Sequence, residues 1–362
     1  MEPGSTLSQR KSTRPLLQAT PGAAGEKSDQ RGRSKAARPA SVNDEDEEVL
    51  VVKGLRVGPG PVLCGALLAS FTLLLLFLGI PTVLARLLYK DSPYVEKPDP
   101  IACHSHNDYW RKEPLFSALK TGCIGIEADV WLVEDDLWIA HEEQDLRRGV
   151  TFTGLYVEPL VKLLEERNTY SEAHGWNTRG VYESDPEQTV VLVVDVKGES
   201  HDTWPVVVAQ LAPLRERGWL THYSEGEVHY RPITVVGSGN TDFDTIVANS
   251  TYRDVFFDAP LDALEDSPYD ATNSFYASVS FVEHLGYSFT GYLSNTQLEK
   301  LRRAVSEAHS RGLKARYWGS PAWALNVRDR IWRTLSDEGV DLVNVDDLQS
   351  FRDWVMTRRG AR

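Results

Sequence analysis

The chain has 362 residues, of which 41% are hydrophobic, so it is long enough to bury the core of one large domain and to carry appended segments. Its formal net charge of -13 at pH 7 argues against a general nucleic-acid-binding protein, because such proteins hold phosphate backbones with surplus Lys and Arg. This charge does not exclude a phosphodiester substrate, since a bound metal ion can supply positive charge locally.

The N-terminal region divides into a polar tail and an apolar run. Residues 1–55 are rich in Ser, Pro, Gly, Ala and charge, which predicts a disordered tail. Pro61 to Ala85 follow without a single charged residue. Because about 20 apolar residues span the hydrocarbon core of a bilayer, residues 61–85 are predicted to form one transmembrane helix, an uncleaved signal anchor. A cleaved signal peptide would start nearer the N-terminus, and a buried core helix is rarely so long and so apolar.

The charges around the apolar run bear on localisation. The basic residues of the tail favour a tail in the cytosol, with the rest of the chain in an endomembrane lumen or at the cell surface. The glycosylation sequon Asn249-Ser250-Thr251 is compatible with that orientation. The tail is also rich in Arg and Ser with few acids before Glu26, so a mitochondrial presequence before an inner-membrane anchor is the alternative.

The chain has three cysteines, and Cys64 lies in the apolar run. Cys103 and Cys123 lie near the starts of two neighbouring predicted strands. A disulfide in an oxidising lumen is one possibility, but free Cys behaves as a small buried hydrophobe. Two buried thiols are therefore the favoured expectation.

From about residue 99 onward, short β-branched runs alternate with amphipathic helical patterns. The predicted strands are Ile101 to His104, Ile124 to Val130, Val190 to Val196, Ile233 to Gly237, Val255 to Asp258, Ser274 to Phe281, Lys314 to Trp318 and Leu342 to Val345. The predicted helices are Glu158 to Arg167, Trp204 to Arg217, Thr296 to Arg311, Val327 to Glu338 and Leu348 to Met356. This alternation predicts an α/β fold, a (β/α)8 TIM barrel over residues 99–356. A doubly wound open sheet is the alternative, although no Gly-x-Gly-x-x-Gly turn follows the first strand.

Polar side chains gather where the predicted strands end, which is the active-site end of such a barrel. Residues two apart in a strand share a face, so Glu127 with Asp129, and Asp195 with Lys197, can point into one cavity. Three carboxylates suit a hard, oxygen-binding ion such as Mg2+ or Ca2+, so Glu127, Asp129 and Asp195 are the candidate metal ligands. His106 ends the first strand and His141 lies on the loop after the second, and these two are the candidate acid and base.

The residues Ser105-His106-Asn107-Asp108-Tyr109, Ile126-Glu127-Ala128-Asp129-Val130 and Ile139-Ala140-His141 resemble the motifs of the phosphatidylinositol phospholipase C-like phosphodiesterases, which include glycerophosphodiester phosphodiesterases and sphingomyelinase D. Asp195-Val-Lys197 is similar to the Asp-x-Lys of sphingomyelinase D, and Tyr317-Trp318 resembles a tryptophan site of the glycerophosphodiesterases. Within this superfamily the chain looks most like the fungal altered inheritance of mitochondria protein 6 family.

The resemblance implies a metal-dependent phosphoric diester hydrolase or lyase that acts on a phospholipid headgroup or a glycerophosphodiester. His106, His141 and Lys197 would be catalytic, and Asn107 and Trp318 would bind substrate. Where glycerophosphodiesterases carry Arg-Gly after the first histidine, this chain has Asn107-Asp108, so neither the substrate nor the attacking nucleophile can be carried over.

Two other functions remain open. His104-x-His106 also looks like the metal-binding pair of amidohydrolases, which would make the protein a zinc hydrolase, although that family needs further histidines after the fifth and sixth strands. A catalytically inactive, membrane-tethered barrel is the third possibility. Asp346 and Asp347 are expected to be structural, as caps of the last helix. No protein partner can be inferred.

Overall fold

The computed structural model describes residues 98–360. The tail predicted at 1–55 and the membrane helix predicted at 61–85 lie outside these residues. Within 98–360, no helix combines the length and apolarity that crossing a bilayer requires.

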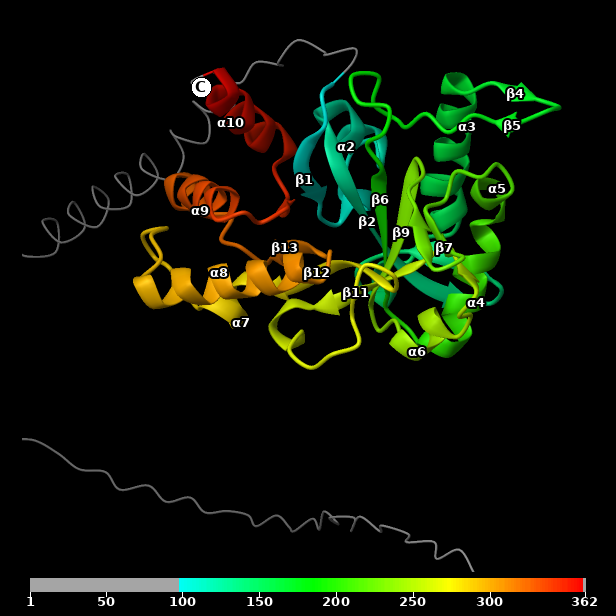
Figure 1. The fold of residues 1–362 in the computed structure, drawn as a ribbon. Coiled ribbons are helices and arrows are strands. Elements are labelled where there is room, and N and C mark those ends of the chain that lie inside the picture. The colour runs from blue at the N-terminus through cyan, green and yellow to red at the C-terminus, as the bar shows by residue number, and fades with distance from the viewer. Residues whose placement is uncertain (1–97, 361–362) are drawn as a thin grey trace, which may run out of the picture. The chain divides into compact units, whose positions relative to one another are not determined.

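Eight parallel strands form a closed barrel at the centre of the described chain (Figure 1). Closure comes from the pairing of the first strand with both the second and the last, which excludes an open sheet for this part of the chain. The strands are β1 (Ile101–Ser105), β2 (Cys123–Val133), β6 (Val190–Val196), β9 (Ile233–Gly239), β11 (Phe256–Pro260), β12 (Ser274–Ser280), β13 (Lys314–Trp318) and β14 (Leu342–Val345). All eight predicted strands are confirmed, with small changes at their ends.

Helices connect the strands and cover the outside of the barrel. In Figure 1, α9 and α10 lie on one side of the strands and α3, α4 and α5 on the other. The helices are α2 (Phe116–Thr121), α3 (Glu158–Arg167), α4 (Ser200–Gln210), α5 (Ala212–Arg215), α6 (Phe243–Val247), α7 (Phe281–Leu285), α8 (Asn295–Ser310), α9 (Leu325–Asp337) and α10 (Leu348–Gly360). The start of α8 is fixed by a capping box, in which Ser294 accepts from the Gln297 backbone and Gln297 reaches back to Ser294.

Six short strands lie outside the ring of eight parallel strands, in three groups. β3 (Asp136–Ile139) pairs antiparallel with the end of β2, and this hairpin returns the chain to the barrel mouth. A two-stranded hairpin consists of β4 (Tyr170–Ser171) and β5 (Gly175–Trp176). A separate three-stranded sheet contains β7 (His222–Ser224), β8 (Glu227–His229) and β10 (Tyr252–Arg253).

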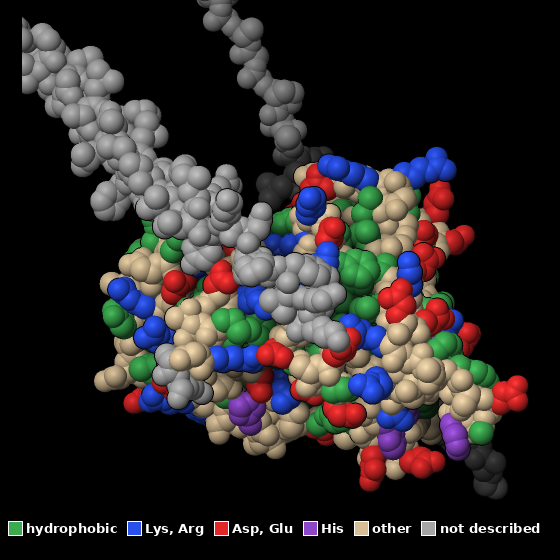
Figure 2. All heavy atoms as spheres, turned by 90° about the horizontal axis from the view of Figure 1, so that it is seen from above, with side chains coloured by type: hydrophobic (Ala, Val, Ile, Leu, Met, Phe, Trp, Pro, Cys, Tyr) green, Lys and Arg blue, Asp and Glu red, His purple; other side chains and the backbone are tan. Residues whose placement is uncertain are grey.

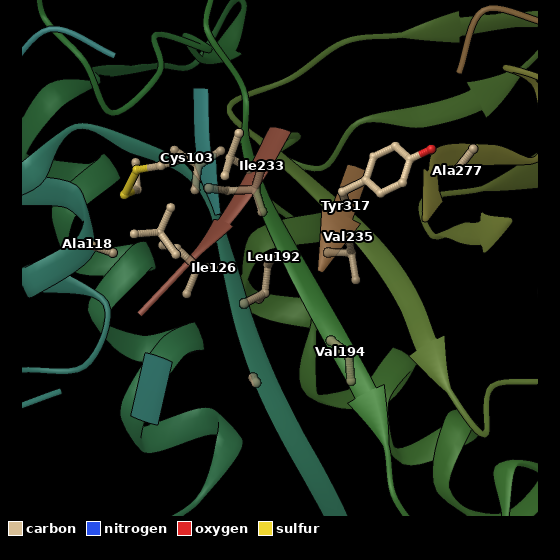
Figure 3. Packing of buried hydrophobic residues seen from close by; sticks show 14 of the residues in the cluster. Cys103, Ala118, Ile126, Leu192, Val194, Ile233, Val235, Ala277 and Tyr317 are labelled. Atoms are coloured by element: carbon tan, nitrogen blue, oxygen red, sulfur yellow. A yellow bond between two sulfur atoms is a disulfide. The ribbon is translucent and has the colours of Figure 1, made fainter. Parts of the chain in front are cut away.

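Two hydrophobic layers hold the barrel together, one on each side of the strands. The larger layer lies between strands and helices, and Figure 3 shows Ile126, Leu192, Val194 and Val235 within it. A smaller layer fills the barrel interior with Val191, Val193, Val236, Phe256, Tyr276 and Leu342. Burial on both faces explains why β6 reads as an unbroken run of Val and Leu until Asp195. Asp195 therefore lies next to the end of β6, where the apolar interior layer ends.

Cys103 and Cys123 form a disulfide between the adjacent strands β1 and β2, with their Cα atoms 4.8 Å apart (Figure 3). Both residues are fully buried. The expectation of two free thiols was wrong, because strand pairing brings the two Cα atoms within the distance that a disulfide spans.

Charged side chains of both signs are interspersed over the face of the molecule shown in Figure 2. The negative net charge of the chain is therefore not gathered into one acidic patch on that face.

Candidate active site

Three carboxylates converge at the carboxyl ends of β2 and β6. Glu127 and Asp129 share the inner face of β2, and Asp129 lies beside Asp195 in the parallel register of β2 with β6. One oxygen from each of the three carboxylates lies within 4.8 Å of those from the other two. The structure thus brings together the three side chains that the sequence proposed as metal ligands.

The donor set of this acidic cluster fits a hard divalent cation. Asp129 Oδ1 is buried and has neither a hydrogen-bond nor an ion-pair partner in the described part of the chain, whereas Glu127 Oε2 lies 3.5 Å from Arg316 and Asp195 Oδ1 lies 3.1 Å from Lys197. A buried carboxylate oxygen without a partner is costly, and coordination of a cation is one of the few ways to offset that cost. Carboxylate oxygens are also the ligands that Mg2+ and Ca2+ prefer.

Lys197 bridges two members of the cluster. Its Nζ lies 3.0 Å from Asp129 Oδ2 and 3.1 Å from Asp195 Oδ1. Burial lowers the pKa of Lys197, but the charges of Asp195 and Asp129 outweigh that effect and the net shift is upward. Burial, together with the charges of Asp129 and Glu127, raises the pKa of Asp195 to about 6, although Lys197 opposes the rise. The ammonium group therefore stays charged beside the acids.

His141 reaches the same cluster from the β3 hairpin. Its Nδ1 lies 3.0 Å from Asp129 Oδ2, and its side chain is 41% exposed. Because an ionised carboxylate only accepts hydrogen bonds, Nδ1 carries the proton and Nε2 is left with a lone pair. Asp129 Oδ2 also accepts a 2.8 Å hydrogen bond from the Tyr109 hydroxyl. Asp129 thereby orients His141, Tyr109 and Lys197 at once.

His106 is paired with an acid from the last strand. Its Nδ1 lies 2.8 Å from Asp346 Oδ1. Burial lowers the pKa of His106, yet the hydrogen bond to Asp346 and the charges of Glu127 and Asp346 raise it above the ordinary value of 6.5. The same hydrogen bond lowers the pKa of Asp346. The expectation that Asp346 caps the last helix was wrong, because its side chain turns to His106 instead. Asp347 does cap α10, since its Oδ1 accepts from the Ser350 backbone N–H at 3.1 Å.

Arg111 ties the His106 segment to the Asp346 segment. One Nη donates to the Asp346 carbonyl, and the other donates to the carbonyls of His106 at 3.0 Å and Val345 at 3.1 Å. Its Nε donates to Ser105 Oγ at 3.3 Å. A planar guanidinium with five N–H donors can hold all of these acceptors, which a lysine cannot.

Beneath the acidic cluster, the barrel interior contains a second layer of charge. Arg316 lies 3.5 Å from Glu127 Oε2 and 3.2 Å from Asp258 Oδ2. His104 Nε2 lies 3.7 Å from Glu127 Oε2. Burial, reinforced by the charge of Arg316, lowers the pKa of His104 to about 4, so this imidazole is neutral at physiological pH. His104 is therefore an interior neighbour of Glu127, and neither His104 nor His106 belongs to the group of residues placed to hold a metal ion within 98–360.

The two residues predicted to bind substrate lie at the mouth in different settings. Asn107 follows β1 in the left-handed region at φ 45°, is 3% exposed, and accepts a 3.0 Å hydrogen bond from Tyr109. Through Tyr109 it is linked to Asp129. Trp318 ends β13 and is 39% exposed, on the strand face that it shares with Arg316. Their roles toward substrate stay predictions.

Sequence reasoning missed four residues that contact these groups. Tyr109 is the last residue of the first motif and Arg111 lies two residues beyond it, so their position in the sequence was the available signal. Arg316 carried a stronger signal, a charged residue inside an otherwise buried strand, which has to find a partner within the barrel. Asp346 could not be paired with His106 without the closed barrel, because the two are 240 residues apart.

The sequence of the chain is similar to those of known proteins. Residues 95–258 match the family model described as the AIM6-like phosphodiesterase domain. Altered inheritance of mitochondria protein 6 homolog from Arthroderma benhamiae is 38% identical over 266 residues, which cover 70% of this chain and 84% of the relative. The protein of that name from Saccharomyces cerevisiae strain S288c is 34% identical over 274 residues, covering 69% of this chain and 70% of its own.

Among solved structures, phosphatidylinositol-specific phospholipase C from Listeria monocytogenes aligns with 74% of this chain and 96% of its own, at 12% identity and a TM-score of 0.40. A similarity this low adds nothing to the sequence matches, which decide the assignment by themselves. The chain belongs to the altered inheritance of mitochondria protein 6 family.

Proposed function

We propose that the protein is a metal-dependent phosphoric diester hydrolase or lyase whose substrate is a phospholipid headgroup or a glycerophosphodiester. The observation that carries this proposal is the convergence of three carboxylates, with the buried Asp129 Oδ1 unpartnered, beside two histidines that each contact an aspartate through Nδ1. The match of residues 95–258 to a phosphodiesterase domain model supports the same class of reaction.

The two histidines supply the proton transfers in this proposal. Because Nδ1 of His106 donates to Asp346, its Nε2 is free to accept the proton of the attacking oxygen, and Asp346 stabilises the imidazolium that results. His141 is oriented by Asp129 in the same way and would protonate the leaving oxygen after taking up a proton at Nε2. Each well-placed transfer contributes about 10²- to 10⁴-fold in rate.

Lys197 and a cation held by the acidic cluster would stabilise the negative charge on the phosphoryl group. Glu127, Asp129 and Asp195 would hold the cation, and a bound Mg2+ or Ca2+ would polarise the phosphoryl group and offset its negative charge. The Lys197 ammonium group, fixed by Asp129 and Asp195, adds a second positive charge at the mouth. The nucleophile is either water or a hydroxyl of the substrate itself, and the products distinguish them.

The zinc amidohydrolase alternative gains no support from the described residues. Within 98–360 the one group placed to hold a metal ion consists of carboxylates alone. The Nδ1 atom of His284, the histidine nearest the sixth strand, forms a hydrogen bond of 2.8 Å with the Tyr317 hydroxyl. Asp258, in the middle of the fifth barrel strand β11, is paired with Arg316.

The test is turnover of a panel of phosphodiesters by the full chain, followed by 31P NMR. A phosphomonoester product identifies hydrolysis and a cyclic phosphate identifies attack by a substrate hydroxyl. His106→Ala and His141→Ala should each reduce turnover at least about 10²-fold. His174→Ala is the matched control, because that side chain is exposed in the turn between β4 and β5, which precedes the start of β6. Equal turnover by all three variants would show that the barrel is an inert module or uses another site.

A further inference from the structure

Two segments at the barrel mouth carry five of the eleven large hydrophobic side chains that are exposed in the described part of the chain. Phe289 is 91% exposed, Tyr287 is 73%, Tyr292 is 67%, Trp323 is 66% and Leu325 is 45%. We name these five residues the aromatic rim. Exposed patches of this kind on a soluble face mark sites of contact with another surface.

The loops of the aromatic rim also lack charge. The stretch from Leu285 to Leu298 and the stretch from Tyr317 to Val327 contain no Asp, Glu, Lys or Arg. This is unusual for a chain in which a quarter of the residues are charged. Protein-binding surfaces commonly use charged residues to attract their partners, and this chain of net charge -13 has many such residues elsewhere. An uncharged aromatic surface is instead typical of contact with the headgroup layer of a bilayer.

Topology places both loops at the same end of the barrel as the acidic cluster. The first loop follows β12 and the short helix α7 and leads into α8, which runs back toward the start of β13. The second loop follows β13 directly and leads into α9. Since all eight strands are parallel, the segments after their carboxyl ends lie at the mouth.

Contacts join the first loop to α9, the helix that the second loop leads into. Arg330 of α9 donates to the Thr290 carbonyl at 2.8 Å, and its guanidinium lies 4.8 Å from the centre of the Tyr292 ring. A pocket beside them is lined by Ser320, Pro321, Ala322 and Leu325 together with Asp346, the partner of His106. One end of the aromatic rim, at Leu325, therefore lines the same pocket as Asp346.

The rest of the chain also favours a bilayer as the occupant. Residues 61–85 are free of charge, and only residues 86–100 separate them from β1. Fully extended, that connection spans at most about 50 Å. The 16-residue helix α8, which runs along the barrel, is about 24 Å long. The connection is longer than this helix, so either end of the barrel can reach a bilayer that holds residues 61–85.

We infer that the aromatic rim docks the barrel mouth onto a phospholipid bilayer, with Phe289 and Trp323 inserted at the level of the headgroups. Amphipathic aromatic rings are favoured at that depth. The inference rests on the proposed function only in making the substrate a lipid of the contacted bilayer.

The experiment measures which end of the barrel touches lipid. The full chain carrying Cys64→Ser and Phe289→Cys is labelled with an environment-sensitive fluorophore and bound to phosphatidylcholine vesicles with brominated acyl chains. The matched control is Tyr230→Cys, because Tyr230 is 56% exposed and precedes β9, at the opposite end of the barrel. We expect quenching at residue 289 to exceed that at residue 230 several-fold. Equal quenching at the two positions, or stronger quenching at residue 230, overturns the inference.

A second measurement links docking to turnover. Phe289→Ser with Trp323→Ser should reduce cleavage of a vesicle-embedded phosphodiester about tenfold or more, and should leave cleavage of a short-chain soluble phosphodiester unchanged. Equal loss on both substrates contradicts the docking role. Quenching requires no turnover, so failure of the proposed activity and failure of docking are observed separately.

Discussion

The imidazole of His106 lies 2.8 Å from the carboxylate of Asp346, across the seam where the first and last strands of the barrel pair. The hydrogen bond raises the pKa of His106 above 6.5 against the effect of burial, and it lowers the pKa of Asp346 below 3.8. The pair therefore stabilises the folded state most between these two values. Its contribution is lost as the pH rises through the pKa of folded His106, and also as the pH falls through the pKa of folded Asp346.

Asp346→Asn should lower the pKa of His106, because it removes the carboxylate and leaves burial as the largest effect. Histidine titration by NMR measures this shift. Turnover should fall about 10²-fold, and the acid limb of its pH profile should move to lower pH. Asp347→Asn is the control: it removes the charge that faces Arg328, keeps an oxygen that can cap α10, and should leave the pKa of His106 unchanged. An unchanged pKa in Asp346→Asn would contradict the assigned pairing.

Lys197→Met should reduce kcat/KM about 10²- to 10³-fold, because it removes a positive charge that the acids hold at the mouth. The pKa of Asp195 should rise above its value of about 6, since Lys197 opposes the upward effect of burial there. Lys314→Met removes a lysine from the opposite end of β13, where it is 51% exposed beside Asp341, and should leave the kinetics unchanged. Equal losses in the two variants would show that Lys197 has no special role.

The sequence predicted the barrel well because strand signals are local. Each strand is a short run of β-branched residues, and burial on both faces made β6 readable without any partner. Glu127, Asp129 and Asp195 were also predictable, since alternation along a strand and the common end of parallel strands place them together.

Three of the missed features depend on pairing between distant segments. Asp346 resembles a helix cap until closure of the barrel brings β14 beside β1. The register of β1 with β2 brought the two cysteines within disulfide distance, and no local pattern indicates that register. Asp258 became the partner of Arg316 only through the order of β11, β12 and β13.

Arg316→Met should lower the free energy of unfolding by about 3–5 kcal/mol, because it leaves the buried carboxylates of Glu127 and Asp258 without their cation. Urea unfolding monitored by circular dichroism measures the change. Arg302→Met is the control, because Arg302 pairs with Glu338 at the surface and should shift the curve only slightly. Comparable losses in both variants would contradict an interior ion-pair network.

Replacing Cys103 and Cys123 with Ser should destabilise the barrel by about 3 kcal/mol, as expected for a cross-link that closes a loop of 20 residues. A reductant should lower the thermal midpoint of the natural chain under unfolding conditions and should not affect the double variant. A natural chain that is indifferent to reductant would favour two free thiols.

Calorimetric titration of Mg2+ and Ca2+ into the chelator-treated full chain tests the central claim most directly. We predict one binding site for at least one of these ions, lost in Asp129→Asn and retained in Asp262→Asn, an aspartate of the 3-10 turn after β11 that lies outside the acidic cluster. Absence of binding by the natural chain, or undiminished binding by Asp129→Asn, would contradict a metal site formed by Glu127, Asp129 and Asp195.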